Sequence, residues 1–437
     1  MVQSAIPVTG RGPASPAAPA ATAGVRDDLL KLFGSVPDGR SGQGRDHPVG
    51  AVLALAAAAV VAGMKGYTAI AGWVKDVPAP VLADLYLRAG AGPARPPSKA
   101  TIWRVITDAD AEVFDATVGN WLMSSLLCEL PAQDGTAGTG QDGPAGSGPD
   151  EPARLMPVRL DGKTVRGAKD TDGNQRHLLA ALAGPTAHSS VVAAQAGVGV
   201  KTNEVPMAKD VPGQIDLNGK LVTADALHTV KATAEFIRES GGEFVLPVKE
   251  NRKALFDALD ALPWHQVPVA HSATDRGHGR ITTRTIQVLP APQDLPFPHV
   301  SQVLLIERYV SDLNGNPVSA VAAFGVASPA ADRASAADLA HHVREQWSIE
   351  SLHWLRDTLY QEDKSQARTR SGPRIMAALR NLAICALRLF GRTDVTEATR
   401  WARAGPWTGP SPSSASHDDL ETAVHGTRRQ TRSSWNR

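Results

Sequence analysis

The sequence predicts an α/β protein in which an all-α N-terminal domain precedes a mixed β-sheet with a β-rich insertion. Helical periodicity dominates residues 27–128, whereas short apolar runs typical of strands begin at residue 155. Three strand-like runs then follow one another before helices and strands alternate, which predicts a sheet that is antiparallel first and parallel later. This is the strand order of ribonuclease H-like folds.

Composition divides the chain into five segments. Residues 1–26 are rich in Ala, Pro, Gly and Ser and offer little to bury, so we expect them to be disordered. The helical domain of residues 27–128 is followed by a Gly/Pro/Asp-rich stretch, residues 129–154, which we interpret as a linker. The α/β domain then covers residues 155–400. The tail, residues 405–437, is rich in Pro and Ser and then basic, and we expect it to be disordered as well.

Strands and helices of the α/β domain are predicted from apolar runs and their breakers. The strand-like runs are residues 155–161, 177–184, 190–199, 220–225 and 243–249. A helix that starts at Asn203 or nearby separates the third run from the fourth. Residues 229–240 form the next helix, which two glycines end. Further β-like runs predict the insertion at about residues 264–328, and helix returns over residues 335–390.

Bulk properties exclude several classes of protein. Lys and Arg number 45 against 44 Asp and Glu, so any nucleic-acid partner would have to be held by local basic patches. Two cysteines, Cys128 and Cys385, are too few for a disulfide framework or a zinc site and indicate a reducing, cytoplasmic location. The most apolar run, Val49–Met64, is shorter than the roughly 20 residues that span a membrane, so we expect a buried helix and a soluble protein.

Two aspartates follow strand-like runs. Asp161 ends the run that begins at Leu155, and at a strand end its carboxylate could face a cleft; an ordinary Asp-Gly turn is the alternative. Asp225 ends the run that begins at Leu221, and the alternative for it is a cap on the following helix. His228, one turn later, could touch a substrate or simply cap.

The third acid lies on a predicted helix. Helical spacing puts Glu350 on a stripe of side chains that is part core and part cleft edge. The alternative is a simple amphipathic helix with Glu350 at its solvent boundary. The other residues of the stripe are Gln346, Trp347, His353, Trp354 and Asp357. Three carboxylates are hard oxygen ligands that suit Mg²⁺ or Mn²⁺. Converging acids of this kind can hold two metal ions for phosphodiester chemistry.

Basic residues near these acids are candidates for phosphate contact. Lys163 and Arg166 follow Asp161 closely, although solvated loop charges would look the same. Lys249, with Asn251, ends the fifth strand-like run and is predicted to lie beside the metals.

Two further segments offer basic side chains to DNA. Residues 276–280 form a Gly-containing basic loop that includes Arg280 and, with Arg284 after it, suits close phosphate approach; a plain hairpin turn is the alternative. In the N-terminal domain, Lys99 and Arg104 lie in a polar, basic helix start like that of a recognition helix. Other basic residues that a DNA surface there could use, or that are scattered surface charge, are Arg40, Arg45 and Lys65.

Several strings carry a family resemblance: DGKTVRGA, HLLAAL, KTNEVP, LVTADALHT, FVLPVKEN and REQWSIESLHWLRDTLYQED followed by ALRNLAI. Together they resemble the ISAs-type insertion-sequence transposases, a bacterial DDE family that includes the H-repeat proteins associated with Rhs elements. The N-terminal strings DGRSGQGRDHPVGAVLALAAAAVVAG, GYTAIAGW and PPSKATIWRVI resemble the helical domain associated with that family. The resemblance covers roughly residues 27–400.

The resemblance implies a ribonuclease H-like catalytic domain whose metal-binding triad is Asp161, Asp225 and Glu350, with Mg²⁺ or Mn²⁺ in a two-metal site. It implies a transposase that binds the terminal inverted repeats of its element, nicks the ends and joins the freed 3′-hydroxyl to target DNA. Cutting two ends in concert implies a homodimer on DNA, in the bacterial cytoplasm and at the nucleoid when bound, with no membrane partner.

One family signature does not transfer. Related transposases with a β-rich insertion carry a Tyr–Arg–Glu–Lys pattern around the third acid, and aligned on Glu350 it falls on Val343, Gln346 and Asp357, with Arg344 displaced by two residues. The unusual tail after residue 405 keeps a second hypothesis open, a decayed remnant that binds DNA without chemistry. A nuclease that cuts a structured nucleic acid and never rejoins it is a third.

Overall fold

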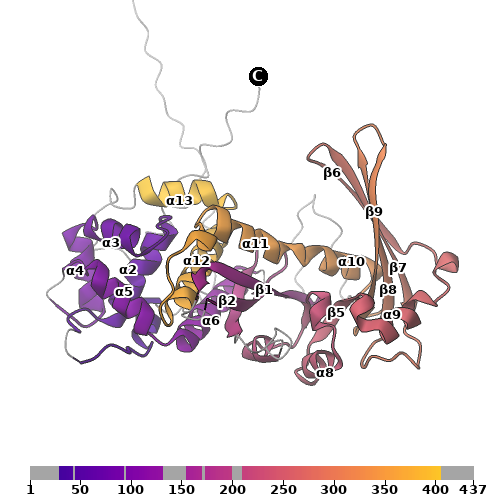
Figure 1. Cartoon of the computed structure of the whole chain (residues 1–437), viewed down its shortest axis with the longest axis horizontal. Helices are drawn as coiled ribbons and strands as arrows, with labels where there is room; N and C mark the ends of the chain where they lie inside the picture. Colours follow the sequence, from indigo (N-terminus) through magenta and orange to yellow (C-terminus); the bar gives the residue numbers. More distant parts are fainter. Residues whose placement is uncertain are drawn as a thin grey trace, which may run out of the picture.

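A nine-stranded sheet forms the backbone of this computed structural model, which describes residues 29–42, 45–92, 95–130, 154–169, 173–198 and 209–404. The N-terminal helices lie at one end of the molecule and a group of long strands at the other (Figure 1). The predicted disordered ends, most of the predicted linker and most of the helix predicted near Asn203 fall outside the described residues.

Helices account for the described N-terminal region, as predicted. They are α1 (Leu29–Gly34), α2 (Val49–Val61), α3 (Tyr67–Lys75), α4 (Ala79–Arg88), α5 (Lys99–Asp108) and α6 (Ala111–Glu129). Local signals fix two starts: the Ser98 hydroxyl accepts the Thr101 N–H at 3.1 Å to begin α5, and Asp110 caps α6. The apolar α2 is buried among its neighbours. No helix in the described part of the chain is long and apolar enough to span a membrane.

The first five strands have the ribonuclease H-like arrangement that the sequence predicts. They are β1 (Met156–Lys169), β2 (Gln175–Ala183), β3 (Val191–Val198), β4 (Lys220–Thr223) and β5 (Glu243–Val248). The antiparallel hairpins β1–β2 and β2–β3 lie on one side of β1. On its other side, β4 pairs parallel with β1, and β5 pairs parallel with β4. Helix α8 (Lys231–Glu239) joins β4 to β5, as parallel pairing requires a crossover.

The predicted insertion is an antiparallel meander that continues the same sheet. After α9 (Lys253–Asp260), β9 pairs with β5, and β8, β7 and β6 follow outward; the strands are β6 (His271–Gly277), β7 (Arg280–Pro290), β8 (Gln302–Asp312) and β9 (Pro317–Ala327). Sequence patterns indicated the last three but not β6. That strand is a polar edge strand with no apolar face, so it lacks the alternation by which strands are detected.

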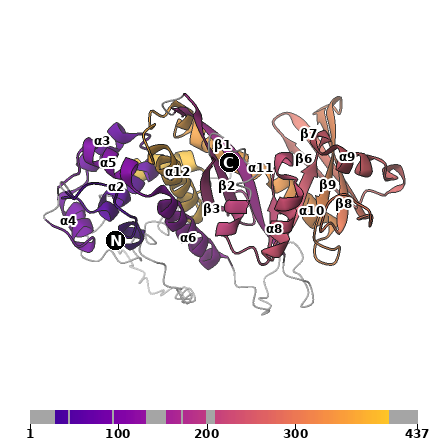
Figure 2. The same cartoon turned by 60° about the horizontal axis from the view of Figure 1, so that its bottom comes forward.

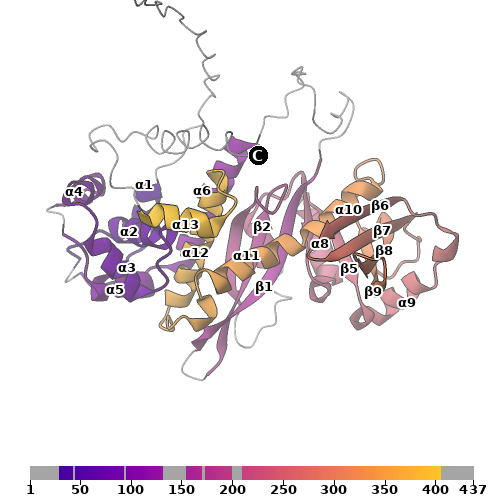
Figure 3. The same ribbon diagram turned by 90° about the horizontal axis from the view of Figure 1, so that it is seen from above.

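The C-terminal helical stretch is broken where a single run was predicted. Its elements are α10 (Ala336–Glu345), α11 (Trp347–Thr358), the short 3₁₀ turn η5 (Glu362–Lys364), α12 (Gly372–Leu389) and α13 (Val395–Ala404). Helices α10 and α11 run one after the other across the sheet (Figure 3). Helix α12 is buried along almost its whole length and packs against α2, α6 and β3 (Figure 2). The N-terminal helices and the sheet therefore share one hydrophobic core.

A buried ion cluster fastens α11 to α12. The fully buried Glu362 carboxylate accepts from Arg356 Nε at 2.8 Å and from Arg380 Nη1 at 2.7 Å, and both guanidinium groups are buried too. Burial alone would raise the pKa of Glu362, but the two arginines outweigh it and lower the pKa to about 2. The cluster is therefore ionised at neutral pH and joins three segments at one point.

We predict that Glu362→Gln lowers the free energy of unfolding by about 3–5 kcal/mol, because it leaves two buried guanidinium charges without a counter-ion. Denaturant unfolding measures the change. Asp84→Asn, which breaks an exposed pair with Arg88, is the matched control and should cost less than about 1 kcal/mol. Equal losses in the two variants would contradict the assignment.

The same cluster sets an acid limit on stability. The pKa of Glu362 is lower in the folded chain than its ordinary 4.5, so its contribution is present above pH 4.5 and is lost as the pH falls toward 2. Across this window the stability of the parent protein should fall more steeply than that of Glu362→Gln.

Candidate active site

Strand register brings the two predicted aspartates to the same level of the sheet. The parallel ladder between β1 and β4 ends at the pair Arg159 and Thr223. Asp161 and Asp225 each lie two residues beyond that pair. Because side chains alternate along a strand, this two-residue step keeps Asp161 on the face of Arg159 within β1, whereas Asp225 follows the end of β4. The carboxyl ends of parallel strands are where open α/β sheets bind ligands.

Asp161 does not end its strand, contrary to the prediction. Strand β1 continues to Lys169 because β2 supplies its hydrogen-bonding partner, and Asp161 pairs with Ala180 in that hairpin. The Asp-Gly pair therefore stays extended and makes no turn. Asp161 is nevertheless accessible, since the neighbouring β4 has already ended at Thr223.

Asp225 is both a cap and a cleft residue. Its Oδ1 accepts the Ala226 N–H at 2.6 Å and so caps the 3₁₀ turn η2 (Ala226–His228). The same oxygen lies 3.4 Å from Lys249 Nζ at the end of β5, and both side chains are more than half exposed. The side chain of His228 is buried in η2, so Asp225 rather than His228 provides the cap.

Glu350 projects from the first turn of α11, which Gln346 anchors to the sheet. Gln346 Nε2 donates to the Leu160 carbonyl at 3.0 Å, and its Oε1 accepts from the Thr223 hydroxyl. One side chain therefore binds β1 beside Asp161 and the end of β4 before Asp225. Glu350 lies one helical turn beyond Gln346 on the same side of the helix.

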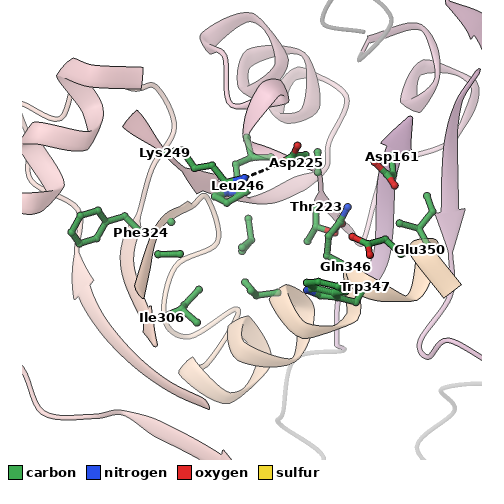
Figure 4. A pocket seen from close by; sticks show the side chains of 17 residues that line it. Asp161, Thr223, Asp225, Leu246, Lys249, Ile306, Phe324, Gln346, Trp347 and Glu350 are labelled. Carbon is green, nitrogen blue, oxygen red and sulfur yellow. Dashed lines mark hydrogen bonds and ion pairs between the residues drawn. The ribbon is translucent and has the colours of Figure 1, made fainter. Parts of the chain in front are cut away.

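The three acids line one cavity of about 410 Å³. Its walls come from the ends of β4 and β5, from the insertion strands and from α10 and α11, and Figure 4 shows Asp161 and Glu350 on one side with Asp225 and Lys249 across from them. The remaining labelled lining is largely apolar: Leu246, Ile306, Phe324 and Trp347. A partly apolar cavity with a few converging charges is typical of active sites.

Electrostatics shows that the acids interact. The pKa of Glu350 is raised, first by burial and then by the negative charges of Asp161 and Asp225. His353, one turn further along α11, places Nδ1 3.3 Å from Asp161 Oδ2. Burial lowers the pKa of His353, against the opposing effect of its contact with Asp161.

The carboxylates surround the cavity without forming a finished coordination cluster. Within the described ranges, no three His, Cys, Asp or Glu side chains are spaced to hold a metal ion. Their chemistry still fits a hard divalent cation, since oxygen donors line the cavity, and burial together with repulsion from Asp161 and Asp225 raises the pKa of Glu350. Asp161, Asp225 and Glu350 are therefore the residues that would hold such an ion.

The basic residues predicted near the acids have different environments. Lys163 is buried, and its Nζ forms a salt bridge of 2.6 Å with Asp357 on α11, so it fixes the helix rather than facing solvent. Arg166 is exposed and lies 3.6 Å from Asp363. Lys249 lies at the cavity as predicted, and Asn251 Nδ2 donates to the Ala226 carbonyl at 3.4 Å.

The more distant basic residues do not converge on this cavity. The loop at residues 276–280 is the hairpin turn between β6 and β7, with His278 and Gly279 both at positive φ. Arg280 is exposed beside it, whereas Arg284 pairs with Asp275 at 2.7 Å. Contact of these residues with DNA remains a prediction.

The predicted recognition helix is α5, on which Lys99 and Arg104 are exposed. The connection from α4 spans residues 89–98, much longer than the three- or four-residue turn of a helix-turn-helix. Of the other basic residues there, Arg40 is buried against Asp38 and Arg45 also contacts that segment. Helices α4 and α5 therefore do not form a helix-turn-helix with α5 as its second helix.

Sequence reasoning did not assign roles to Gln346 and His353. Both lie on the same predicted helical stripe as Glu350, Gln346 four residues before it and His353 three residues after it. This spacing was the only signal in the sequence that could have indicated a role for them. Their contacts with Leu160, Thr223 and Asp161 depend on long-range packing, which spacing does not show.

Comparisons with known proteins find matching family models and relatives. The family model described as transposase DDE domain matches residues 157–386, and the one described as DDE_Tnp_1-associated matches residues 30–122. An uncharacterized protein in the dhlA 3′ region of Xanthobacter autotrophicus is 29% identical over 59% of this chain and 79% of its own length. The H repeat-associated putative transposase YhhI of Escherichia coli K12 is 24% identical over 52% of this chain, which spans 62% of that relative.

Among solved structures, the piggyBac transposase synaptic complex with hairpin DNA aligns over 64% of this chain and 55% of its own, with 10% identity. The TM-score of 0.34 is too low for any inference about this chain to rest on it.

We predict that Asp225→Asn lowers the pKa of Glu350, because it removes a negative charge that disfavours the glutamate carboxylate. A carboxyl-carbon NMR titration in metal-free buffer, with Glu350→Gln to assign the signal, measures the shift. Asp257→Asn on α9 is the control and should leave the signal in place. An unchanged pKa in Asp225→Asn would show that the acids do not face a common space.

Proposed function

Because the chain belongs to the transposase DDE domain family, we propose that it binds the terminal inverted repeats of a mobile element, cleaves the DNA strands there and joins them to target DNA. The observation that carries the proposal is the convergence of Asp161 on β1, Asp225 just after β4 and Glu350 on α11 on one cavity. We assign these three residues as the catalytic triad.

The proposed chemistry is in-line displacement at phosphorus. Divalent ions, Mg²⁺ or Mn²⁺, supply activation of the attacking oxygen and stabilisation of the leaving oxygen in such sites. Asp161, Asp225 and Glu350 would hold them. Lys249, 3.4 Å from Asp225, places a cation at the rim where a scissile phosphate would approach.

Neighbouring side chains would keep the acids in place. Gln346 ties α11 to both strand ends, and His353 contacts Asp161. Such supporting contacts orient ligands and are commonly needed for full activity. Trp347 and Trp354 are both exposed and flank Glu350 on the same side of α11, which suits stacking against bases near the cut.

The second hypothesis, a remnant that binds DNA without chemistry, is not favoured. All three acids face the cavity, and the Glu350 environment supports a functional carboxylate cluster rather than a decayed one. Concerted action at two ends implies that two copies of the chain act together, so we also propose a homodimer in the DNA complex.

We predict that Asp161→Asn, Asp225→Asn and Glu350→Gln each reduce nicking and joining by more than about a hundredfold, because removing a ligand costs at least as much as disturbing its support. Nicking and joining are measured on labelled DNA that carries the element's terminal repeats, in the presence of Mg²⁺ or Mn²⁺. Chelation of the metal should stop both reactions of the parent protein. Asp257→Asn is the control. Specific binding without cleavage by the parent would establish the remnant instead, and cleavage without joining would point to a nuclease.

We predict that Gln346→Ala slows cleavage by roughly 10–100-fold and leaves DNA affinity nearly unchanged, since α11 would lose its attachment to both strand ends. Thr223→Val removes only the hydroxyl partner of Gln346 and should act in the same direction with a smaller effect. Cleavage rates and binding curves for both single variants and the double variant measure this. Fully additive effects would show that the two side chains do not act as a unit.

A further inference from the structure

A second cavity, of about 400 Å³, lies where the N-terminal helices meet the segment that follows α11. Three lysines from separate parts of the chain line it: Lys65 before α3, Lys99 at the start of α5 and Lys364 in η5. The cavity is distinct from the proposed active site, with which it shares no lining residue.

The lysines of this cavity have no neutralising partner. Within the described residues none of the three forms a salt bridge, and the cavity lining contains no Asp or Glu. The acids nearest to Lys364 in sequence are already engaged, since Glu362 binds Arg356 and Arg380, while Asp363 lies close to Arg166 and Lys163. Three unpaired ammonium groups make the cavity strongly positive.

The cavity also contains backbone donors. Helix α3 begins at Gly66 without any side-chain cap, and its first turn, Gly66 to Ala69, forms part of the wall. Uncapped N–H groups and the positive end of the helix dipole favour an anion at this position.

Two tyrosine hydroxyl groups lie buried behind the wall of the cavity. Tyr360 is fully buried and lines the cavity, yet within the described part of the chain its hydroxyl has no hydrogen-bond partner; the hydroxyl of Tyr67, another lining residue, is in the same state. Buried hydroxyl groups are ordinarily paired. Burial raises the pKa of both tyrosines, so they would remain donors at neutral pH.

We propose that this cavity binds a phosphate group of the DNA backbone, held by Lys65, Lys99, Lys364 and the start of α3. The proposal rests on the proposed function, which makes DNA the partner. Ten residues separate Glu350 from Tyr360, and at the rise of an α-helix this is roughly 15 Å. The bound phosphate would therefore lie about four or five nucleotides from the cut, given roughly 3.4 Å per nucleotide along a strand.

The test compares DNA affinity across salt concentrations for the full-length protein and its variants. Lys99→Gln combined with Lys364→Gln should weaken binding about tenfold and reduce the slope of log K against log salt by about 1–2. Lys75→Gln, at the other end of α3, changes the same charge and should have little effect.

Three further results decide the ligand. Replacing the phosphate four or five nucleotides from the cut by an uncharged methylphosphonate should weaken DNA binding by the parent protein but not by the double lysine variant. If inorganic phosphate raises Tm in a lysine-dependent way while DNA affinity is unchanged in every variant, the cavity binds free anions and the proposal is overturned. If the parent protein cleaves DNA and the lysine variants keep its DNA affinity, the phosphate site is wrong and the proposed activity stands. If DNA affinity depends on the lysines but the parent protein does not cleave, the proposed activity is wrong and the phosphate site stands.

Discussion

The buried ion cluster of Glu362 with Arg356 and Arg380 is the interaction on which the arrangement of this molecule depends. It joins α11, the following turn and α12 at a point from which water is excluded, so each charge relies on the others. Helix α12 in turn packs against the N-terminal helices and β3, and Arg380 also reaches the Lys65 carbonyl at 3.4 Å. The helix that carries Glu350 is thereby held in a fixed relation to the N-terminal helices and to β3.

The candidate active site follows from two independent constraints on the chain. Parallel pairing sets Asp161 and Asp225 level with each other, and Gln346 joins the end of that ladder to the helix of the third acid. Neither constraint involves the acids themselves, so the scaffold can hold like charges close together at a cost in electrostatic energy. Burial and this repulsion together raise the pKa of Glu350, and a bound cation would relieve the repulsion.

The near-neutral net charge conceals an uneven distribution. Several arginines and lysines are consumed by internal ion pairs, as Lys163 is by Asp357 and Arg374 by Asp115. The three lysines of the second cavity are not, and they come from segments that are far apart in sequence. Counting charges along the chain therefore underestimates local positive potential, because folding decides which cations keep a partner.

The sequence by itself determined the order of elements and the identity of the acids. Apolar periodicity and breakers predicted the N-terminal helices, the first five strands and most of the insertion, because these signals are local. These local signals did not predict β6, a polar edge strand. They also placed the end of β1 at Asp161, whereas pairing with β2 extends the strand beyond that residue. Only the tertiary structure decided that Gln346 anchors α11, that Lys163 is buried and that Lys65, Lys99 and Lys364 share a cavity, since each depends on contacts between residues distant along the chain.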